Sequence, residues 1–342
     1  MTRRAPVDWS VDPSLAGARE VMPGLWRLRL PLNWPGIDHT NAYAVDAEGG
    51  GIVLFDCGAA GADGDDTHEA ALDIALAAAG RRIEEVELLV GTHAHADHMG
   101  LAAHVVERSG CELWAHPQTE VLYDAFHDPD GIEARRRAFA RREGVPEDYV
   151  PACADIREET DGVADAVEPD VALGEGSVIP TALGPWRALA TPGHTPSHLC
   201  FLQEERRTMV VADLVCAAFA PWFDHGYSHD PYGEWQASLE RIADLGGVDI
   251  GLPGHGRPAV DLPALLTEHR TGLAGRLDAT RTALVEGPAT AWEITCRLFG
   301  TPQDERAAVL QVDEAVAYLR HLQRSRLAVR AVTEGGFRYA AT

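Results

Sequence analysis

The chain has 342 residues, of which 46% are hydrophobic, and its formal net charge at pH 7 is -24. This length exceeds the usual size of one domain, so a large domain with a smaller one is expected. The negative charge disfavours nucleic acid as a partner, and because all 29 basic residues are arginine, chemistry that needs a Schiff-base or P-loop lysine is excluded.

The N-terminal stretch, MTRRAPVDWSVDPSLAG, has two arginines but no apolar core, so it does not predict a secretory signal. No run approaches the roughly 18 apolar residues that span a bilayer. The six cysteines show no CxxC spacing and are expected to be reduced, small hydrophobic side chains. We therefore expect a cytoplasmic protein that does not associate with membranes.

The first part of the chain alternates strand and helix patterns. From about Val21, the runs LWRLRLPL and NAYAVDAEGGGIVLFDCG predict strands, with a hairpin turn at Asp46 to Gly51. THEAALDIALAAAGRRIEEV predicts a helix, EEVELLV a buried strand, and HMGLAAHVVERSG a helix that stops at Gly110. This alternation favours a layered α/β architecture.

A cluster of polar residues, GTHAHADHMG, lies between that buried strand and the next helix. On an extended strand end, His93 and His95 project to the same side and can share one ion. Asp97 and His98 follow where the chain turns, so they can serve a second ion. The alternative is a polar loop that is merely rich in histidine, but four candidate ligands arrive together here.

Further along, residues of about 124–170 predict an inserted, charged helical segment, interpreted either as a solvated helix face or as a lid over the site. Three short segments at the ends of predicted strands then present candidate ligands: ATPGHTPSH turns after the WRALA strand and presents His194, MVVADLV is an apolar strand that ends on Asp213, and IGLPGHG presents His255. A carboxylate at the end of a buried run is costly unless it is paired or binds a metal.

The C-terminal part predicts a small winged-helix domain over residues 263–342, after a first domain of residues 1–262. Its helices are expected at about 264–286, in AWEITCRLFG and in VDEAVAYLRHLQRSRLAV, followed by two short strands in AVRAVTEGGFRYAA. Residues 264–342 hold ten arginines and nine acidic residues, whereas a nucleic-acid surface should be clearly basic. We interpret this domain as a packing, pocket-closing or dimerisation module, so a homodimer is one possible assembly.

These motifs together resemble the metallo-β-lactamase fold superfamily, whose signature is HxHxDH followed by single His, Asp and His positions. The resemblance covers about Val21 to Arg257 and extends to glyoxalase II-like and thioesterase-like hydrolases that carry a C-terminal winged helix. It implies a four-layer αβ/βα sandwich, and Asp56 of FDCG would support the metal loop. The implied ligands are His93, His95 and His194 for one metal ion, Asp97, His98 and His255 for the other, and Asp213 for both.

The resemblance also implies a mechanism. Two divalent ions would share a water molecule and lower its pKa toward about 7, and the bridging hydroxide would attack an ester, thioester or lactone carbonyl. Asp97 would take the proton of this water, or act as a ligand only. Histidine and carboxylate ligands suit zinc best, and they also suit iron or manganese.

Three departures bear on the substrate. Asp213 stands where secreted β-lactamases with a mixed site have cysteine, and Cys216 stands where quorum-signal lactonases have tyrosine. This chain also lacks the lysine with which related enzymes bind glutathione. A small acyl substrate is expected, with Trp222, Phe223 and Tyr227 forming a wall of its pocket or, alternatively, packing as ordinary core. Other readings are a nuclease for single-stranded RNA, a β-lactamase-like amide hydrolase and a winged-helix regulator that binds nucleic acid.

Overall fold

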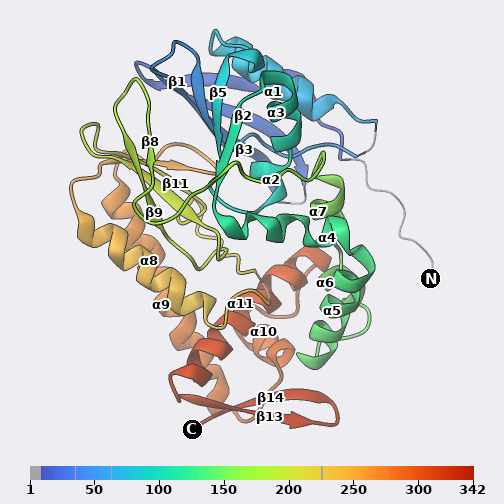
Figure 1. Ribbon diagram of the computed structural model, residues 1–342. Coiled ribbons are helices and arrows are strands. Elements are labelled where there is room, and N and C mark those ends of the chain that lie inside the picture. Colours follow the sequence, from blue (N-terminus) through green and yellow to red (C-terminus); the bar gives the residue numbers. More distant parts are fainter. Residues whose placement is uncertain (1–8, 35, 63, 225) are drawn as a thin grey trace.

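The computed structural model describes residues 9–34, 36–62, 64–224 and 226–342. Two β-sheets lie between helices in the upper part of the molecule, and a mainly helical lobe lies below them (Figure 1). Residues 1–8 lie outside the described residues. They belong to the N-terminal stretch that we expected not to be a secretory signal. Within the described ranges, no helix is long and apolar enough to cross a membrane.

The first sheet has seven strands in chain order: β1 (Gly17–Met22), β2 (Leu25–Trp34), β3 (Ile37–Asp46), β4 (Ile52–Phe55), β5 (Val86–Val90), β6 (Glu112–Ala115) and β7 (Val171–Ala172). Strands β1 to β4 are antiparallel, and β4 to β7 are parallel. The predicted hairpin turn joins β3 to β4, where the N–H of Ala47 donates to the carbonyl of Gly51 at 2.9 Å.

The second sheet has the strand order β12, β11, β10, β9, β8. Its strands are β8 (Val178–Ile179), β9 (Trp186–Ala190), β10 (Leu199–Gln203), β11 (Thr208–Ala212) and β12 (Ile250–Pro253). The β10–β11 pair is antiparallel, whereas β11 and β12 are parallel. Helix α8 (Pro231–Leu245) provides the crossover that a parallel pair needs.

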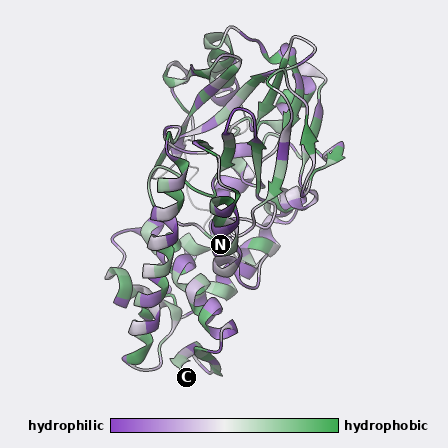
Figure 2. Cartoon of the chain, turned by 90° about the vertical axis from the view of Figure 1, so that its left-hand side faces the viewer, coloured by the Kyte–Doolittle hydropathy of each residue, from purple (hydrophilic) through white to green (hydrophobic). Residues whose placement is uncertain are grey.

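The two sheets pack face to face, with helices on both outer faces. Between the sheets, the ring of Phe55 lies 5.1 Å from that of Phe201 and 5.5 Å from that of Trp186. Helices α1 (Thr67–Ala78), α2 (Ala96–Met99) and α3 (Ala102–Ser109) share a core with the first sheet, and α8 and α9 (Leu262–Val285) share one with the second. Figure 2 shows the hydrophobic residues along the strands. The predicted four-layer sandwich is confirmed.

The lower lobe combines the inserted segment with the C-terminal part. The insertion, which follows the 3-10 helix Pro117–Tyr123, forms α4 (Asp124–His127), α5 (Pro129–Arg142), α6 (Val150–Cys153) and α7 (Arg157–Asp161). The C-terminal part continues after α9 with α10 (Ala291–Phe299), α11 (Glu305–Arg324), β13 (Ala328–Thr333) and β14 (Gly336–Ala341). Ala140 and Val150 of the insertion are in one core with Ile294, Val312 and Leu319.

Helix α11 begins at Glu305 rather than at Val312, where the predicted segment began. The Asp304 side chain caps the helix by accepting a hydrogen bond from the N–H of Ala307 at 2.8 Å. An acidic residue at this position satisfies an N–H group that the first turn leaves without a partner, so the helix can start there.

Candidate metal centre

The ends of strands from both sheets converge at one edge of the sandwich. His93 follows β5, His194 follows β9, Asp213 follows β11 and His255 follows β12. Helix α2 supplies Asp97 and His98, and its N-cap is His95. The structure brings all seven predicted residues together in three overlapping groups whose ligand atoms lie within 4.8 Å of one another: His93, His95 and His194; His93, His98 and Asp213; and Asp97, His98 and His255.

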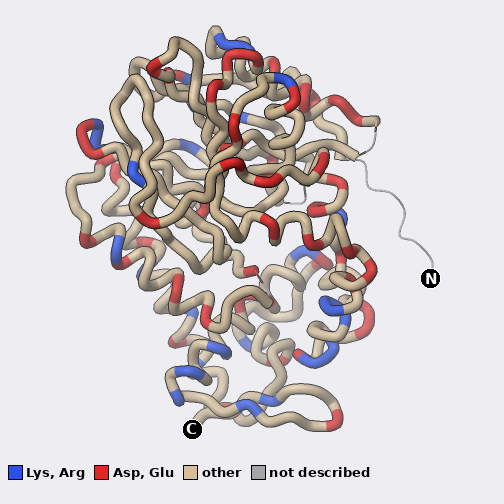
Figure 3. Tube along the Cα trace, viewed as in Figure 1, with Lys and Arg blue, Asp and Glu red and all other residues tan. Residues whose placement is uncertain are grey.

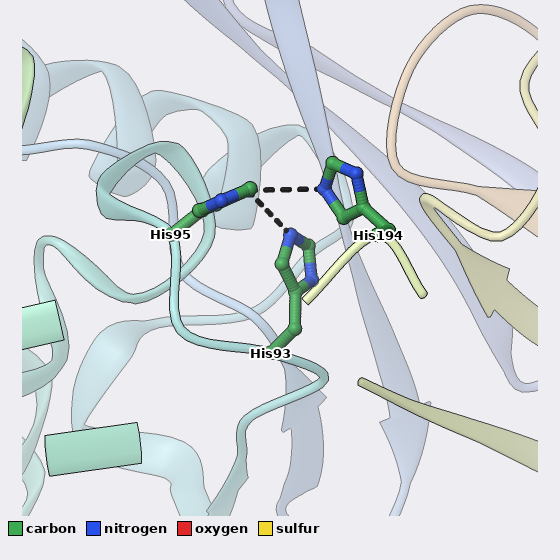
Figure 4. A group of neighbouring side chains, drawn as sticks. All are labelled: His93, His95 and His194. Atoms are coloured by element: carbon green, nitrogen blue, oxygen red, sulfur yellow. Dashed lines mark hydrogen bonds between the residues drawn. The ribbon is translucent and has the colours of Figure 1, made fainter. Parts of the chain in front are cut away.

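Three histidines of the first group point their ring nitrogens at one another (Figure 4). Nδ1 of His95 lies 3.1 Å from Nε2 of His93 and 3.0 Å from Nε2 of His194. Burial lowers the pKa of His93 well below its usual value and that of His194 to about 4. Burial alone would also lower the pKa of His95, but the Asp224 carboxylate outweighs it and raises this pKa to about 9. Three converging nitrogens suit a cation between them.

The other two groups share His98 and combine histidines with two carboxylates, Asp97 and Asp213. Nε2 of His255 lies 3.2 Å from Oδ2 of Asp97 and 3.3 Å from Oδ2 of Asp213. Nε2 of His98 lies 3.6 Å from Asp97 and 3.5 Å from Asp213, and this buried nitrogen has no hydrogen-bond partner among the described residues. A buried nitrogen left in this way beside two carboxylates fits a divalent cation.

Each of the five candidate-ligand histidines makes a hydrogen bond through one ring nitrogen, and this leaves its other ring nitrogen directed at the centre. His95 donates through Nε2 to Asp224 at 3.1 Å. The other four donate through Nδ1, at 2.8 to 3.1 Å, to Thr92 Oγ1 (from His93), Asp56 Oδ2 (from His98), the Trp222 carbonyl (from His194) and the His39 carbonyl (from His255). Asp56 also accepts from the N–H and hydroxyl of Thr92, at 2.9 and 2.8 Å, so it connects His98 to the start of the loop.

The backbone around the centre is strained and closely packed. Asp56 and Ala212, which stand at the ends of β4 and β11, have φ angles of 61° and 41°, in a region that non-glycine residues rarely adopt. At Gly254, a Cβ atom would lie 2.0 Å from Oδ1 of Asp213 and 2.5 Å from the His98 ring, so only glycine fits. Strain of this kind concentrates at functional sites.

Sequence reasoning missed two side chains that support the centre. Asp224 was not predicted, although it directly follows Trp222 and Phe223 of the predicted aromatic wall. His198 was also missed: its Nε2 accepts the backbone N–H of Asp213 at 3.1 Å, and its Nδ1 lies 2.8 Å from the Thr191 hydroxyl. The only signal for His198 was its place four residues after His194.

A cavity of about 420 Å³ lies between the segment that carries Trp222 and Asp224 and the helices of the lower lobe, and its described lining includes none of the seven candidate ligands. Trp222, Phe223 and Tyr227 all line it, as does Asp224, which contacts His95. Phe223 is 0% exposed and packs 5.0 Å from the Trp235 ring, whereas Tyr227 is 38% exposed. The rest of the lining comes mainly from α5, α7 and α11.

Comparison with known proteins agrees with this geometry. Residues 35–255 match a family described as the metallo-beta-lactamase superfamily. The probable metallo-hydrolase YqjP of Bacillus subtilis is 28% identical over 313 residues, which cover 86% of this chain and 91% of that protein. The metallo-beta-lactamase family protein TTHA1429 of Thermus thermophilus has a TM-score of 0.80 at 25% identity, covering 94% of this chain and 100% of its own. An atrochrysone carboxyl ACP thioesterase of Aspergillus chevalieri is 31% identical over 160 residues, which cover 44% of this chain and 47% of that protein.

Proposed function

The chain belongs to the metallo-beta-lactamase superfamily, and from that premise we propose that it is a binuclear metal-dependent hydrolase of an ester, thioester or lactone bond. The observation that carries the proposal is the complete set of seven candidate ligands, each histidine of which is oriented by a second contact. A protein of this fold that had lost its catalytic activity would be expected to have lost some of these ligands.

The residues present fit two divalent ions, with zinc favoured and iron or manganese compatible. When bound, such ions supply Lewis acidity and lower the pKa of water. Burial would raise the pKa of Asp97, but His98 and His255 outweigh it and hold this pKa far below its usual value. An ionised Asp97 can accept a proton from the attacking water, and the alternative is that it acts as a ligand only.

The cavity favours an acyl substrate. Trp222 and Tyr227 offer aromatic surface in the cavity, and Asp224 of the same lining contacts His95. Arginines and acidic side chains form much of the remaining lining, and ligand pockets combine apolar and aromatic surface with polar groups that orient the ligand. Among the bond types considered, a thioester gains support from the fungal relative named as an ACP thioesterase. The absence of lysine disfavours the lysine-dependent glutathione recognition of related enzymes.

The test is a substrate panel run on metal-loaded wild type and Asp97→Ala. The panel contains p-nitrophenyl esters, acyl-CoA thioesters, lactones, nitrocefin and single-stranded RNA. We expect turnover of esters or thioesters that falls by at least about 100-fold in the variant. Asp130→Ala, an exposed carboxylate on α5, is the control and should match wild type. Equal activity of wild type and Asp97→Ala would refute the mechanism, and turnover of nitrocefin or RNA alone would refute the substrate class.

A further inference from the structure

We propose that Arg306 and Trp222 form a contact that positions two ligands of the first metal site from the C-terminal lobe. Arg306 is then a positioning residue that acts on His95 and His194 through Trp222. The inference rests on the metal centre of the proposed function, and it does not depend on which bond is hydrolysed.

Trp222 touches the supports of both histidines. Its carbonyl accepts the hydrogen bond from Nδ1 of His194 at 3.1 Å. Its indole Nε1–H donates to Oδ1 of Asp224 at 3.3 Å, and Oδ1 of Asp224 also accepts from Nε2 of His95 at 3.1 Å. A displacement of Trp222 would therefore disturb the orientation of two of the three histidines in Figure 4.

Trp222 lies in an irregular segment between β11 and α8, so packing from outside that segment must hold it in place. The Arg306 guanidinium lies over its ring, with Cζ at 4.9 Å from the ring centroid, which is within the range of a cation–π contact. Nη1 of Arg306 also donates to Oε1 of Glu158 at 2.8 Å. Arg306 is in the first turn of α11 and Glu158 is in α7, so both halves of the lower lobe hold Trp222.

The four residues Glu158, Arg306, Trp222 and Asp224 all line the 420 Å³ cavity. The same side chains thus border the proposed substrate space and support the metal ligands. The side chain of Glu158 is 25% exposed and that of Arg306 is 21% exposed, so their ion pair is largely shielded from water. Such shielding makes the contact less sensitive to salt than a surface pair.

Chelator competition on the zinc-loaded protein tests this inference without measuring turnover. In Arg306→Met we expect one of the two zinc ions to bind about tenfold more weakly, the lower end of the effect of losing a support of a ligand, and the other ion to bind as in wild type. The matched control is Arg320→Met, which also removes an arginine that lines the cavity from α11 but that lies over Phe139 instead. It should bind both ions as wild type does.

Single-site backgrounds identify the ion that is affected. His255→Ala retains the first group of histidines, and His194→Ala disrupts that group while leaving the other two groups, which contain His98, complete. Adding Arg306→Met should weaken zinc binding about tenfold in the His255→Ala background and leave it unchanged in the His194→Ala background. Unchanged zinc affinity in the first background, or equal losses in both, would overturn the inference.

Two further variants guard against a trivial loss of folding. Trp222→Phe keeps the ring face and the backbone carbonyl but removes the indole N–H, so it should weaken the first site less than Arg306→Met does. Arg306→Lys keeps the cation and should restore part of the affinity. If no substrate in the panel is hydrolysed while these zinc affinities follow the expected order, the proposed hydrolysis fails and this inference stands.

Discussion

At the scale of single residues, Asp224 is the support whose loss should be easiest to measure. Its carboxylate holds Nε2 of His95 and, with smaller contributions from Asp97 and Asp213, outweighs burial and raises the pKa of that ring to about 9. We expect Asp224→Asn to weaken zinc binding by about 10- to 100-fold at the site that includes His95, because an amide orients the ring without the charge. Chelator competition measures this effect.

Asp124→Asn is the matched control, because Asp124 lines the same cavity and its carboxylate accepts from the Tyr227 hydroxyl at 3.3 Å rather than from a ligand. It should leave both zinc affinities unchanged. Equal zinc affinities for wild type and Asp224→Asn would show that His95 does not need this carboxylate.

The candidate ligands could be predicted because their spacing carries the chemistry. His93, His95, Asp97 and His98 lie within six residues of the chain, and His194 and His255 each follow a Pro-Gly turn at a strand end. Of their supports, the resemblance indicated Asp56, but the carbonyl groups of Trp222 and His39 could not be predicted, because they have no signature in the sequence. Contacts of this kind depend on which loops the fold brings together.

At the scale of elements, the hairpins and most of the strands followed from turn residues and hydrophobic alternation. The common core of the insertion and the C-terminal helices could not be predicted in this way. Ala140 and Ile294 are distant in the chain, and nothing in the local sequence indicates that they pack together. The early start of α11 depended on the cap at Asp304, which lies outside the apolar pattern that predicted the helix.

A buried hydrogen bond links the insertion to the last strand. The hydroxyl of Tyr339 in β14 donates to the carboxylate of Glu143, which follows α5 and is 0% exposed. Tyr339→Phe should lower the free energy of unfolding by about 1–3 kcal/mol, because a buried carboxylate loses a donor. Urea unfolding at pH 7 measures this change.

Tyr149→Phe is the control for this prediction, since its hydroxyl makes a long contact, 3.5 Å, with the carbonyl of Pro302. It should change the stability by less than about 0.5 kcal/mol. A Tyr339→Phe protein as stable as the control would show that the insertion and the C-terminal part are not joined by this bond.

At the scale of the whole molecule, metal removal should destabilise the fold. Asp97 is buried and the Asp213 side chain is 11% exposed, and both carboxylates lie beside His98 and His255. Ions that bind only the folded state stabilise it by mass action. We expect treatment with a chelator to lower Tm by about 5 °C or more, with recovery when zinc is added back. An unchanged Tm in protein shown by metal analysis to be free of metal would contradict the proposed centre.

The charge and packing of the molecule also predict that it does not bind RNA. Figure 3 shows acidic residues along the chain of the sandwich and basic residues interspersed with acidic ones in the lower lobe, and the formal net charge is -24. In a winged-helix protein the helix before the hairpin would contact nucleic acid. Here α11 packs against α6 and α8, and its Arg306 contacts Glu158 and Trp222.

Fluorescence anisotropy with a labelled single-stranded RNA should show no binding at micromolar protein in about 0.1 M salt. Binding that weakens steeply as salt is raised would instead reveal a phosphate-binding surface and favour the nuclease reading.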